Sequence, residues 1–491
     1  MEALMIVVTA QALLGAFDLA YHHEMTERLT WKKTASAELR LHAARNGIYA
    51  VIFLVLAWAE PHGLLAIAFA GLLVIEIAIT LTDFVIEDRT RLLPASERVL
   101  HTVLAISYGA FLALFAPYLV AWAGEPTALV LVERGAWSAV MTVFAVGVAY
   151  WTLRDTARSH AVGQAPSVAD PGADLVTDYL DGNKRILITG GTGFIGRRLT
   201  AALVEAGHHV TVLTRDARKA RDLPLPVRIT TDLDSFGDDE VFDAVVHLAG
   251  APVATRRWTA KRKSVLRASR IDTTRALVAF IGRLEIKPEV LITASAIGYY
   301  GSDSERPVTE NTKPQPGFSN AMCAACEAES RKACRYGVRV VQLRLGLVLA
   351  AHGGPLGMMM PSFEFGLGAR LGSGRQWMSW VHLDDVIAMI AFLIARDDLR
   401  GPFNAVAPVP VRNAQFSVAL ARQLGRPCLF AIPAGVIRFV FGEMGQELLL
   451  ASKRVQPIRL CDAGFGFRCP NLEEALRVSL ASDQPAVNPT A

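Results

Sequence analysis

The chain has 491 residues, of which 52% are hydrophobic and 20% charged, and its mean hydropathy is +0.32. This length exceeds one ordinary domain, and this composition excludes a wholly soluble protein. The net charge is only +4, and no dense Lys/Arg block with interleaved aromatic residues occurs, which excludes nucleic-acid binding. The six cysteines lack the regular spacing of a disulfide framework, so we expect reduced cytosolic thiols. Cys323 and Cys326 form a CxxC without a second pair, which argues against a zinc site.

Apolar residues are concentrated before residue 155, in five stretches long enough, or nearly so, to cross a bilayer at about 1.5 Å per residue. We expect membrane spans near Ala3–Tyr21, Asn46–Trp58, Leu64–Thr82, Val99–Ala123 and Trp137–Leu153. The second is short and can reach span length only by extending toward Leu41, which brings His42 and Arg45 to the interface or just inside it. The first lacks the basic start and the cleavage site of a signal peptide, so we expect it to be retained.

Basic residues alternate between the connections, which predicts an orientation. They are Arg28, Lys32, Lys33, Arg40 and Arg45 in the first connection, Arg89, Arg91 and Arg98 in the third, and Arg154 and Arg158 after the last span. The second connection has none and the fourth only Arg134. The positive-inside rule therefore predicts a multi-pass protein of the inner (cytoplasmic) membrane, with an external N-terminus and a cytoplasmic C-terminal half.

Ionisable residues gather near the predicted cytoplasmic ends of these spans. They are Asp18, His22, His23, Glu24, Glu38, His42, Glu76, Asp83, Glu87 and His101. One interpretation is a set of interfacial caps, ion pairs and snorkelling side chains. The other is a metal or haem site within the bundle, with His22, Glu38, His42 and His101 as candidate ligands.

A Pro-, Gly- and Asp-rich segment, residues 160–183, reads as a linker. We predict a transmembrane helical domain at 1–155, a linker at 156–183, an α/β Rossmann domain with a doubly wound parallel sheet at 184–400, and a smaller C-terminal α+β lobe with a tail at 401–491.

A glycine-rich loop directly follows the linker, in ILITGGTGFIGRRL. The flanking pattern predicts a strand at Ile186–Thr189, a helix from Phe194 to Ala206 and a second strand at His209–Thr214. Gly190 permits a tight turn, Gly193 lets the backbone approach a pyrophosphate, and Gly196 lets the helix pack closely. With Thr192, Phe194 and Ile195 these residues predict a dinucleotide site at a helix N-terminus.

The end of the second predicted strand usually selects between NAD and NADP. Thr214, Arg215, Arg218 and Lys219 occupy it, and cationic donors favour the 2′-phosphate of NADP. Asp216 is adjacent, so NAD stays possible, and the alternative is a solvated basic loop. Further cofactor contacts are predicted at Asp232 and Leu233 beside the adenine, at Ala249, Gly250 and Ala251, and at Thr293 and Gly346.

The motifs TGGTGFIG, VVHLAGAP, LITASAIGYYG and WVHLDDV resemble the extended short-chain dehydrogenase/reductases. With GAPVATRRWT, GLGARLGSGRQWMSWVHLDDV and AGFGFRCPNLEEAL, the chain from Lys184 to Val478 is similar to the YfcH-type epimerase family, which has a C-terminal domain of unknown function. The resemblance implies that Ser295 is the catalytic serine. It also shows a departure, since Ser319 and Cys323 fall where the family's Tyr and Lys are expected.

Tyr299 and Tyr300 follow Ser295 and could supply the missing phenol, although a packing role is equally compatible with the sequence. Arg375 and Gln376 lie in a glycine-rich stretch where an arginine could bind an anionic substrate; the alternative is an ion pair of Arg375 with Asp384 or Asp385. For His382 we expect a structural hydrogen-bonding role.

Three functions are compatible with these features. The first is a membrane-anchored NADP-dependent oxidoreductase or epimerase acting on an unidentified small molecule. The second is an NADP-binding module that senses the cofactor and is coupled to the membrane bundle. The third is a membrane redox protein with a metal or haem fed by NADPH.

Overall fold

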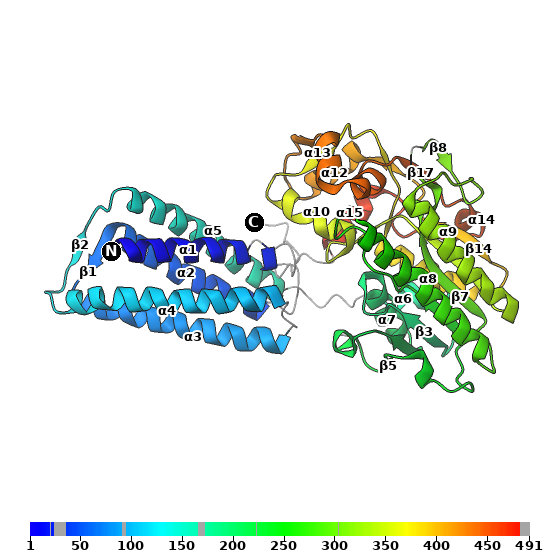
Figure 1. Cartoon of the computed structure of the whole chain (residues 1–491), viewed down its shortest axis with the longest axis horizontal. Coiled ribbons are helices and arrows are strands. Elements are labelled where there is room, and N and C mark those ends of the chain that lie inside the picture. The colour runs from blue at the N-terminus through cyan, green and yellow to red at the C-terminus, as the bar shows by residue number, and fades with distance from the viewer. Residues whose placement is uncertain are drawn as a thin grey trace. The chain divides into compact units, whose positions relative to one another are not determined.

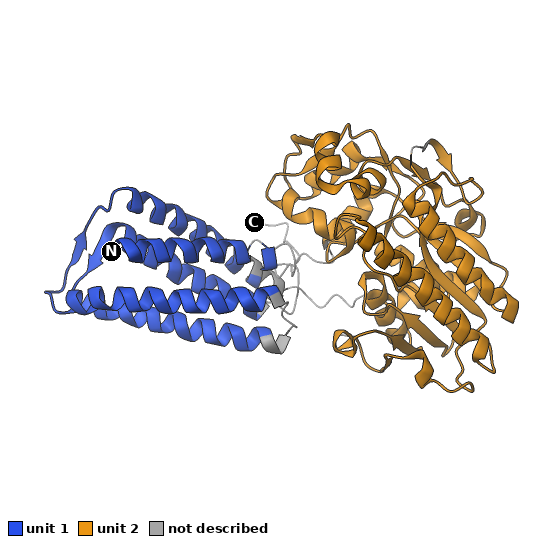
Figure 2. Ribbon diagram, viewed as in Figure 1, with its two compact units in different colours: residues 1–166, 483–491 blue, residues 167–482 orange. Residues whose placement is uncertain are grey.

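The structure is a computed structural model that describes residues 1–19, 21–23, 36–90, 95–164, 172–221, 223–302 and 304–481. The chain divides into two compact units, which meet in sequence between Pro166 and Ser167 (Figure 2). We call residues up to Pro166 unit 1 and Ser167–Ser482 unit 2.

Unit 1 is a bundle of long helices with one short two-stranded sheet (Figure 1). Its helices are α1 (Glu2–Asp18), α2 (Ser36–Trp58), α3 (Leu64–Thr90), α4 (Ala95–Ala123) and α5 (Ala136–Gln164). Its strands β1 (Ala59–Pro61) and β2 (Leu129–Leu131) pair antiparallel at the end of the bundle where the N-terminus lies. All five helices are long and apolar enough to cross a membrane, by length and composition.

Helix α2 differs from the short span that we predicted. It begins at Ser36, ten residues before the predicted start at Asn46, and its apolar window runs over Ala37–Trp58. The helix continues through His42 and Arg45 because both side chains find buried partners inside the bundle. Arg28, Lys32, Lys33 and Arg91, used for the orientation, and Glu24 lie outside the described residues.

Unit 2 is built on a seven-stranded parallel sheet in the order β14-β9-β7-β6-β3-β4-β5. Its strands are β3 (Arg185–Thr189), β4 (His209–Leu213), β5 (Val227–Thr230), β6 (Ala244–His247), β7 (Val290–Ala296), β9 (Arg339–Leu345) and β14 (Gly401–Ala405). From β3 the chain adds β4 and β5 on one side, then crosses back and adds β6, β7, β9 and β14 on the other. This is the doubly wound Rossmann arrangement that the sequence predicts.

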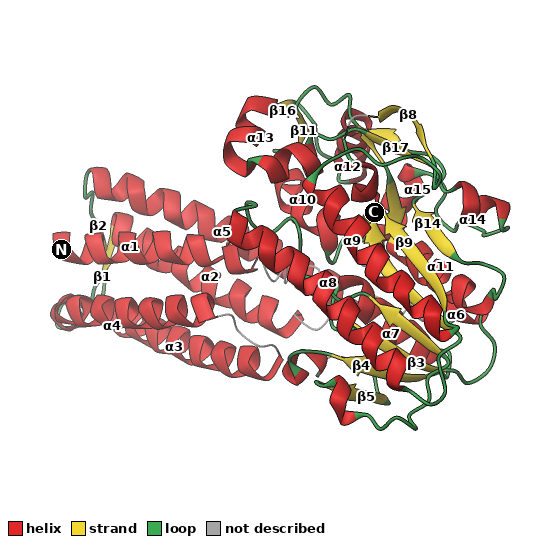
Figure 3. Ribbon diagram, turned by 45° about the vertical axis from the view of Figure 1, so that its right-hand side comes forward, coloured by secondary structure: helices red, strands yellow, loops and turns green. Residues whose placement is uncertain are grey.

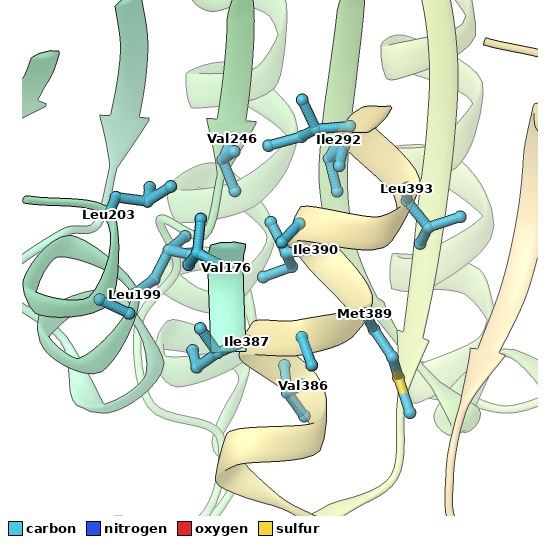
Figure 4. Packing of buried hydrophobic residues seen from close by; sticks show 14 of the residues in the cluster. Val176, Leu199, Leu203, Val246, Ile292, Val386, Ile387, Met389, Ile390 and Leu393 are labelled. Carbon is cyan, nitrogen blue, oxygen red and sulfur yellow. The ribbon is translucent and has the colours of Figure 1, made fainter. Parts of the chain in front are cut away.

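Helices cover both faces of the sheet (Figure 3). They are α6 (Asp174–Thr177), α7 (Phe194–Glu205), α8 (Ala260–Arg283), α9 (Phe318–Arg331) and α11 (Leu383–Ala395). Alternate strand residues face opposite layers: Ile186 and Ile188 belong to the core with α6, α7 and α11, and Leu187 to the core with α8. Helix α11 is buried on nearly every side against the sheet, as its apolar sequence requires (Figure 4).

A smaller α+β lobe completes unit 2. Its helices are α10 (Gly354–Glu364), α12 (Asn413–Gln423), α13 (Ala434–Phe441), α14 (Ile458–Asp462) and α15 (Leu472–Ala481). Its strands form four pairs: β10 (Leu347–Leu349) with β13 (Trp380–His382), β11 (Ala369–Leu371) with β16 (Phe430–Ile432), β12 (Trp377–Met378) with β15 (Val411–Arg412), and β8 (Ser304–Val308) with β17 (Lys453–Val455). The predicted boundary at residue 400 falls just before β14, so the sheet takes in five residues that we had assigned to the lobe.

Candidate functional site

The loop between β3 and α7 has the shape that its glycines predict. Gly190 has a φ of +76°, and a Cβ there would lie 2.8 Å from Ala249 N of the neighbouring β6 loop. A Cβ on Gly196 would lie 2.2 Å from Gly190 O, so this glycine lets the helix pack on the loop itself. Helix α7 starts after Gly193 without a side-chain cap, which leaves the first-turn amides of Phe194 and Ile195 to a ligand.

Arg197 holds the glycine-rich loop between β3 and α7 against the loop that follows β4. Its Nε donates to Thr192 O at 3.0 Å, and its Nη2 donates to Lys219 O at 3.2 Å. This links the β3 loop to the β4 loop, which carries the predicted cofactor-selecting residues.

The residues after β4 separate into engaged and exposed groups. Thr214 is buried, and its amide donates to Thr230 O at 2.9 Å. Asp216 accepts from both the backbone and the guanidinium of Arg218, and that guanidinium lowers the pKa of Asp216. Arg215 is exposed. Arg218 is therefore already engaged by a carboxylate of its own loop.

The loop after β6 is held by a buried polar chain. His247 lies between the hydroxyls of Thr189, at 2.6 Å, and Thr274, at 2.9 Å, and burial lowers its pKa to about 4. Arg270 of α8 donates to Ala251 O at 3.0 Å, and a Cβ on Gly250 would lie only 2.9 Å from its guanidinium carbon. These contacts fix the Ala249–Ala251 loop against β3.

Four other predicted cofactor residues have structural partners. Asp232 is exposed and caps the short 3₁₀ helix that begins at Leu233. Thr293 is buried, with its hydroxyl 3.4 Å from Val341 O in the neighbouring strand. A Cβ on Gly346 would lie 2.7 Å from Ser379 O, so this glycine permits a close approach of backbones within unit 2.

Ser295, near the end of β7, belongs to a buried charged network. Its Oγ donates to Glu327 Oε1 at 2.8 Å. Arg344 binds both oxygens of the same carboxylate, each at 2.9 Å, and the parallel register places Arg344 directly beside Ser295. Glu327 and Arg344 are 1% and 3% exposed, so this ion pair is fully buried and bidentate.

The two tyrosines after Ser295 differ in their contacts. The Tyr300 hydroxyl donates to Asn404 Oδ1 at 2.6 Å and accepts from Arg344 Nη1 at 2.8 Å, and burial raises its pKa to about 12. The Tyr299 ring lies under the Arg344 guanidinium, at 3.5 Å from the ring centroid, and is half-buried. No hydrogen bond joins its hydroxyl to the residues that the structure describes. Of the two phenols, that of Tyr300 is therefore the one held in the charged network by hydrogen bonds.

The positions of the missing Tyr and Lys lie on α9 and are closed. Ser319 and Cys323 are buried, and burial raises the pKa of the Cys323 thiol to about 11. The carboxylate of Glu447 accepts from the amides of Phe318 and Ser319 at the start of the helix. The buried ammonium of Lys453, from β17, donates to Glu447 O at 3.3 Å, and burial lowers its pKa.

The two predicted substrate residues also differ. Gln376 is buried, and its amide donates to Leu371 O and Leu449 O, which gives it a structural role within the lobe. Arg375 is exposed, and the predicted alternative pairing fails. Asp384 binds Arg198 at 2.8 Å, and Asp385 accepts from the amides of Arg468 and Cys469.

His382 has the structural role that we expected, since its Nδ1 accepts from the amide of Asp384 at the start of α11. Cys323 and Cys326 are free and buried on one helix. Among the described residues, none of the groups with metal-ligand geometry contains a cysteine.

In unit 1, the polar residues near the helix ends are buried rather than snorkelling. His22 is hydrogen bonded at both nitrogens, to Asp18 at 2.7 Å and Ser96 at 3.2 Å, and is absent from the groups with metal-ligand geometry among the described residues. Glu38, His42 and His101 do belong to such groups. They are joined there by His23, Asp83, Glu87 and Glu97.

Comparisons with known proteins fit this geometry. The model of the NAD dependent epimerase/dehydratase family matches residues 186–405, and that of a domain of unknown function, DUF1731, matches residues 432–478. An epimerase family protein of Mycobacterium tuberculosis (strain CDC 1551 / Oshkosh) is 41% identical over 294 residues, which cover 60% of this chain and 97% of the relative. A chloroplastic SDR39U1 homolog of Arabidopsis thaliana is 34% identical over 311 residues, or 62% of this chain and 88% of the relative.

A solved structure has the same fold. The crystal structure of human epimerase family protein SDR39U1 (isoform 2) with NADPH aligns with a TM-score of 0.55 and 29% identity, over 60% of this chain and 99% of that one. The chain therefore belongs to the NAD dependent epimerase/dehydratase family. Its DUF1731 match and these relatives confirm the narrower resemblance that the motifs of unit 2 predict.

Proposed function

We propose that the chain is a membrane-anchored, NADP-dependent oxidoreductase or epimerase that acts on a small molecule. The observation that carries this proposal is that the glycine-rich loop and Ser295 lie at the same edge of the parallel sheet. The glycine loop follows β3, Ser295 lies near the end of β7, and Tyr299 lies in the 3₁₀ turn directly after β7. Only β6 separates β3 from β7 in the sheet. Ligands of doubly wound sheets bind at the carboxyl ends of the strands.

The residues present fit a dinucleotide. Side chains at Gly190 or Gly196 would fill the space in which the loop is folded, and the uncapped start of α7 presents amide hydrogens and a partial positive charge to a diphosphate. The human relative was solved with NADPH, which supports NADP here, as does the exposed Arg215. A bound nicotinamide supplies or accepts the hydride.

The chain's own residues then handle the substrate oxygen. Because Ser295 donates its proton to Glu327, its oxygen can accept a hydrogen bond from a substrate hydroxyl and orient it. In its phenolate form, Tyr299 would take the hydroxyl proton as hydride passes from the carbon to the oxidised nicotinamide, and in its phenol form it would return the proton in the reverse direction. The Arg344 guanidinium packs over the Tyr299 ring and fixes its position, and Tyr300 holds Arg344 in place.

The distribution of side chains in unit 1 supports the membrane anchor. Every helix exposes a large apolar side chain, for example Ile6, Val51, Val74, Ile106 and Val143. The buried side chains include several carboxylates and imidazoles. Apolar side chains outside and ionisable ones inside are typical of a bundle in lipid. With the positive-inside rule, we propose that the end bearing Asp18, His42 and His101 faces the cytoplasm, together with unit 2.

A second candidate is a non-catalytic NADP-binding module. The closed positions of Ser319 and Cys323 favour it, because neither residue can replace the phenol and ammonium that the family's motif supplies. The two candidates differ in one respect, namely whether Tyr299 exchanges a proton with a substrate.

The full chain in detergent, screened for NADPH oxidation with carbonyl compounds and for NADP⁺ reduction with alcohols, tests the enzyme. We expect Tyr299→Phe to lower kcat about 10²–10⁴-fold with unchanged NADPH affinity. Tyr336→Phe, an exposed tyrosine of unit 2, is the control and should leave kcat unchanged. Binding of NADPH with no turnover of any compound would favour the binding module. Turnover indifferent to Tyr299→Phe and Ser295→Ala would instead contradict the catalytic roles given to these two residues.

Cofactor binding is tested separately. Gly196→Ala places a methyl group against Gly190 O, so we expect NADPH affinity to fall at least about 100-fold, or about 2.7 kcal/mol. Gly466→Ala, where a Cβ meets nothing within 4 Å, should bind as the parent does. Calorimetric titration checks both variants, and a parent chain that is folded but binds no pyridine nucleotide would contradict the proposal.

A further inference from the structure

Three helices of unit 1, and the end of α1 with the segment after it, each place two ionisable residues four positions apart, a spacing at which side chains of a helix are neighbours. The pairs are Asp18 and His22 at the end of α1, Glu38 and His42 in α2, Asp83 and Glu87 in α3, and Glu97 and His101 in α4. His23 follows the first pair. All of these residues are buried except His101, whose side chain is 12% exposed. We call these nine residues the bundle cluster.

The ligand atoms of one group converge on a point. One ligand atom from each of His23, Glu87, Glu97 and His101 lies within 4.8 Å of the others. Ligand atoms at about 2.0–2.3 Å from one ion are about 3.3–3.8 Å apart in a tetrahedral site and about 4–4.6 Å apart across an octahedral one, so the group needs shifts of no more than about 1–1.5 Å to close on an ion. The four residues come from three separate segments, so their convergence is not a consequence of local helix geometry.

A second group shares a carboxylate with the first. His42, Asp83 and Glu87 satisfy the same distance limit, and so do His23, Glu38 and His42. The His23 and His42 rings are 4.6 Å apart between centroids. A carboxylate with two oxygens, common to two adjacent ligand sets, is how helical bundles bridge two metal ions.

His23 gives an independent indication of a ligand. It is 2% exposed, and neither ring nitrogen makes a hydrogen bond with the part of the chain that the structure describes. Its Nε2 lies 3.4 Å from Asp18 and 3.7 Å from Glu97, contacts that lack hydrogen-bond geometry. A buried imidazole normally has partners, as the neighbouring His22 does at both nitrogens.

One carboxylate oxygen of Asp83 also lacks a hydrogen-bond partner among the described residues. Its Oδ2 accepts from Arg45 at 3.0 Å and lies 3.2 Å from His42 Nε2. Its buried Oδ1 makes no hydrogen bond to any described residue. One oxygen is thus engaged by the ion pair and the other is available to a ligand in the same space.

We propose that the bundle cluster binds two divalent transition-metal ions. One ion is held by His23, Glu97 and His101, the other by His42 and Asp83 with Glu38 close by, and Glu87 bridges them. Imidazole with carboxylate suits Fe²⁺, Mn²⁺ or Zn²⁺, whereas Mg²⁺ and Ca²⁺ prefer oxygen alone and Cu⁺ prefers sulfur.

Metal analysis of the full chain, solubilised in detergent after expression in supplemented medium, tests the proposal. We expect about two ions per chain, and about two Co²⁺ taken up by chelator-treated protein, with visible absorption from nitrogen and oxygen ligation. Glu87→Gln should lower the affinity for both ions at least tenfold. His62→Gln, a histidine beside Glu60 near the β1–β2 end, should keep both.

Other results of the metal analysis would overturn the proposed two-metal centre. Wild-type chain that is monodisperse but holds no metal and takes up no Co²⁺ contradicts the centre, and uptake of one ion only contradicts the bridged pair. A folded Glu87→Gln chain that retains two ions contradicts the assignment of Glu87 as a ligand. A Soret band in the purified chain would show haem and contradict the two-metal centre.

A measurement on the wild type alone covers variants that fail to fold. Removing metal with a chelator should lower the midpoint of thermal unfolding, and Mn²⁺ should restore it while Mg²⁺ should not. A midpoint that is indifferent to chelation would count against the centre.

Discussion

Both units bury ionisable side chains, but they do so in opposite surroundings. In unit 2, Glu327 and Arg344 lie at the end of a sheet with an apolar core, and each group has a defined partner. In unit 1, imidazoles and carboxylates lie inside a bundle whose outer surface is apolar, and His23 lacks any hydrogen-bond partner among the described residues.

The difference shows that burial alone does not define the role of a charge. A bidentate pair that satisfies both partners holds other groups in position, as Arg344 does for Tyr299 and Tyr300. Imidazoles and carboxylates that converge around a buried histidine without a hydrogen-bond partner among the described residues indicate a ligand, even where some of them, such as His42 and Asp83, contact one another. The predictions below test this contrast from the largest expected effect to the smallest.

The largest effect is expected from breaking the paired network of unit 2. Glu327→Gln leaves the buried Arg344 without its counter-charge, and removing one partner of a buried pair costs about 3–5 kcal/mol. Scanning calorimetry of the full chain should show a lower unfolding temperature. Glu240→Gln removes a partner of Arg228, which is half exposed, and should cost less than about 1 kcal/mol. Equal effects of the two changes would remove the distinction between the pairs.

A charged substitution tests whether the outer surface of unit 1 faces lipid. Ile106 is 69% exposed near the middle of α4, and Ile106→Lys should oppose membrane insertion by about 2.5–3.5 kcal/mol if that surface faces lipid. Leu429→Lys changes a residue of unit 2 that is 80% exposed, and should be tolerated. The yield of folded protein in the membrane fraction measures both. Normal insertion of the Ile106→Lys chain would contradict the bilayer assignment.

The sequence was sufficient where the signal is local. The β3–α7–β4 unit and the five long helices follow from periodicity, glycine spacing and length, which act within one element. Helix α2 was predicted too short because His42 and Arg45 look like interface residues until the bundle supplies Asp83.

The charged network could not be predicted in this way. Glu327 reads as a polar position on α9, and only the pairing of β7 with β9 places Arg344 beside Ser295. The one local signal was an arginine inside the apolar strand VVQLRLGLVLA. Gln376 was assigned to substrate from its loop, whereas the lobe uses its amide for two backbone carbonyls.

A pH effect is expected from His247. Burial lowers its folded-state pKa to about 4, below the value of about 6.5 in an unfolded chain. The unfolded chain therefore binds more protons between these values, and unit 2 loses stability as the pH falls through that window, by about 2 kcal/mol at pH 5. His247→Gln should flatten this dependence in unfolding experiments at pH 5 and 7. His209→Gln, an exposed histidine on β4, should leave it unchanged, and a similar slope in both variants would exclude His247 as its source.

The smallest effect is expected at the cofactor-selecting loop. Arg215 is exposed, whereas Arg218 is shared with Asp216, so Arg215→Ala should weaken NADPH binding about tenfold, or about 1.4 kcal/mol, and leave NADH binding unchanged. Arg218→Ala should have a smaller effect, because its guanidinium already donates to a carboxylate. Calorimetry with both coenzymes measures the four affinities. A tenfold loss at Arg218 with none at Arg215 would mean that the coenzyme displaces Asp216, and the contrast between paired and open charges would then fail on this loop.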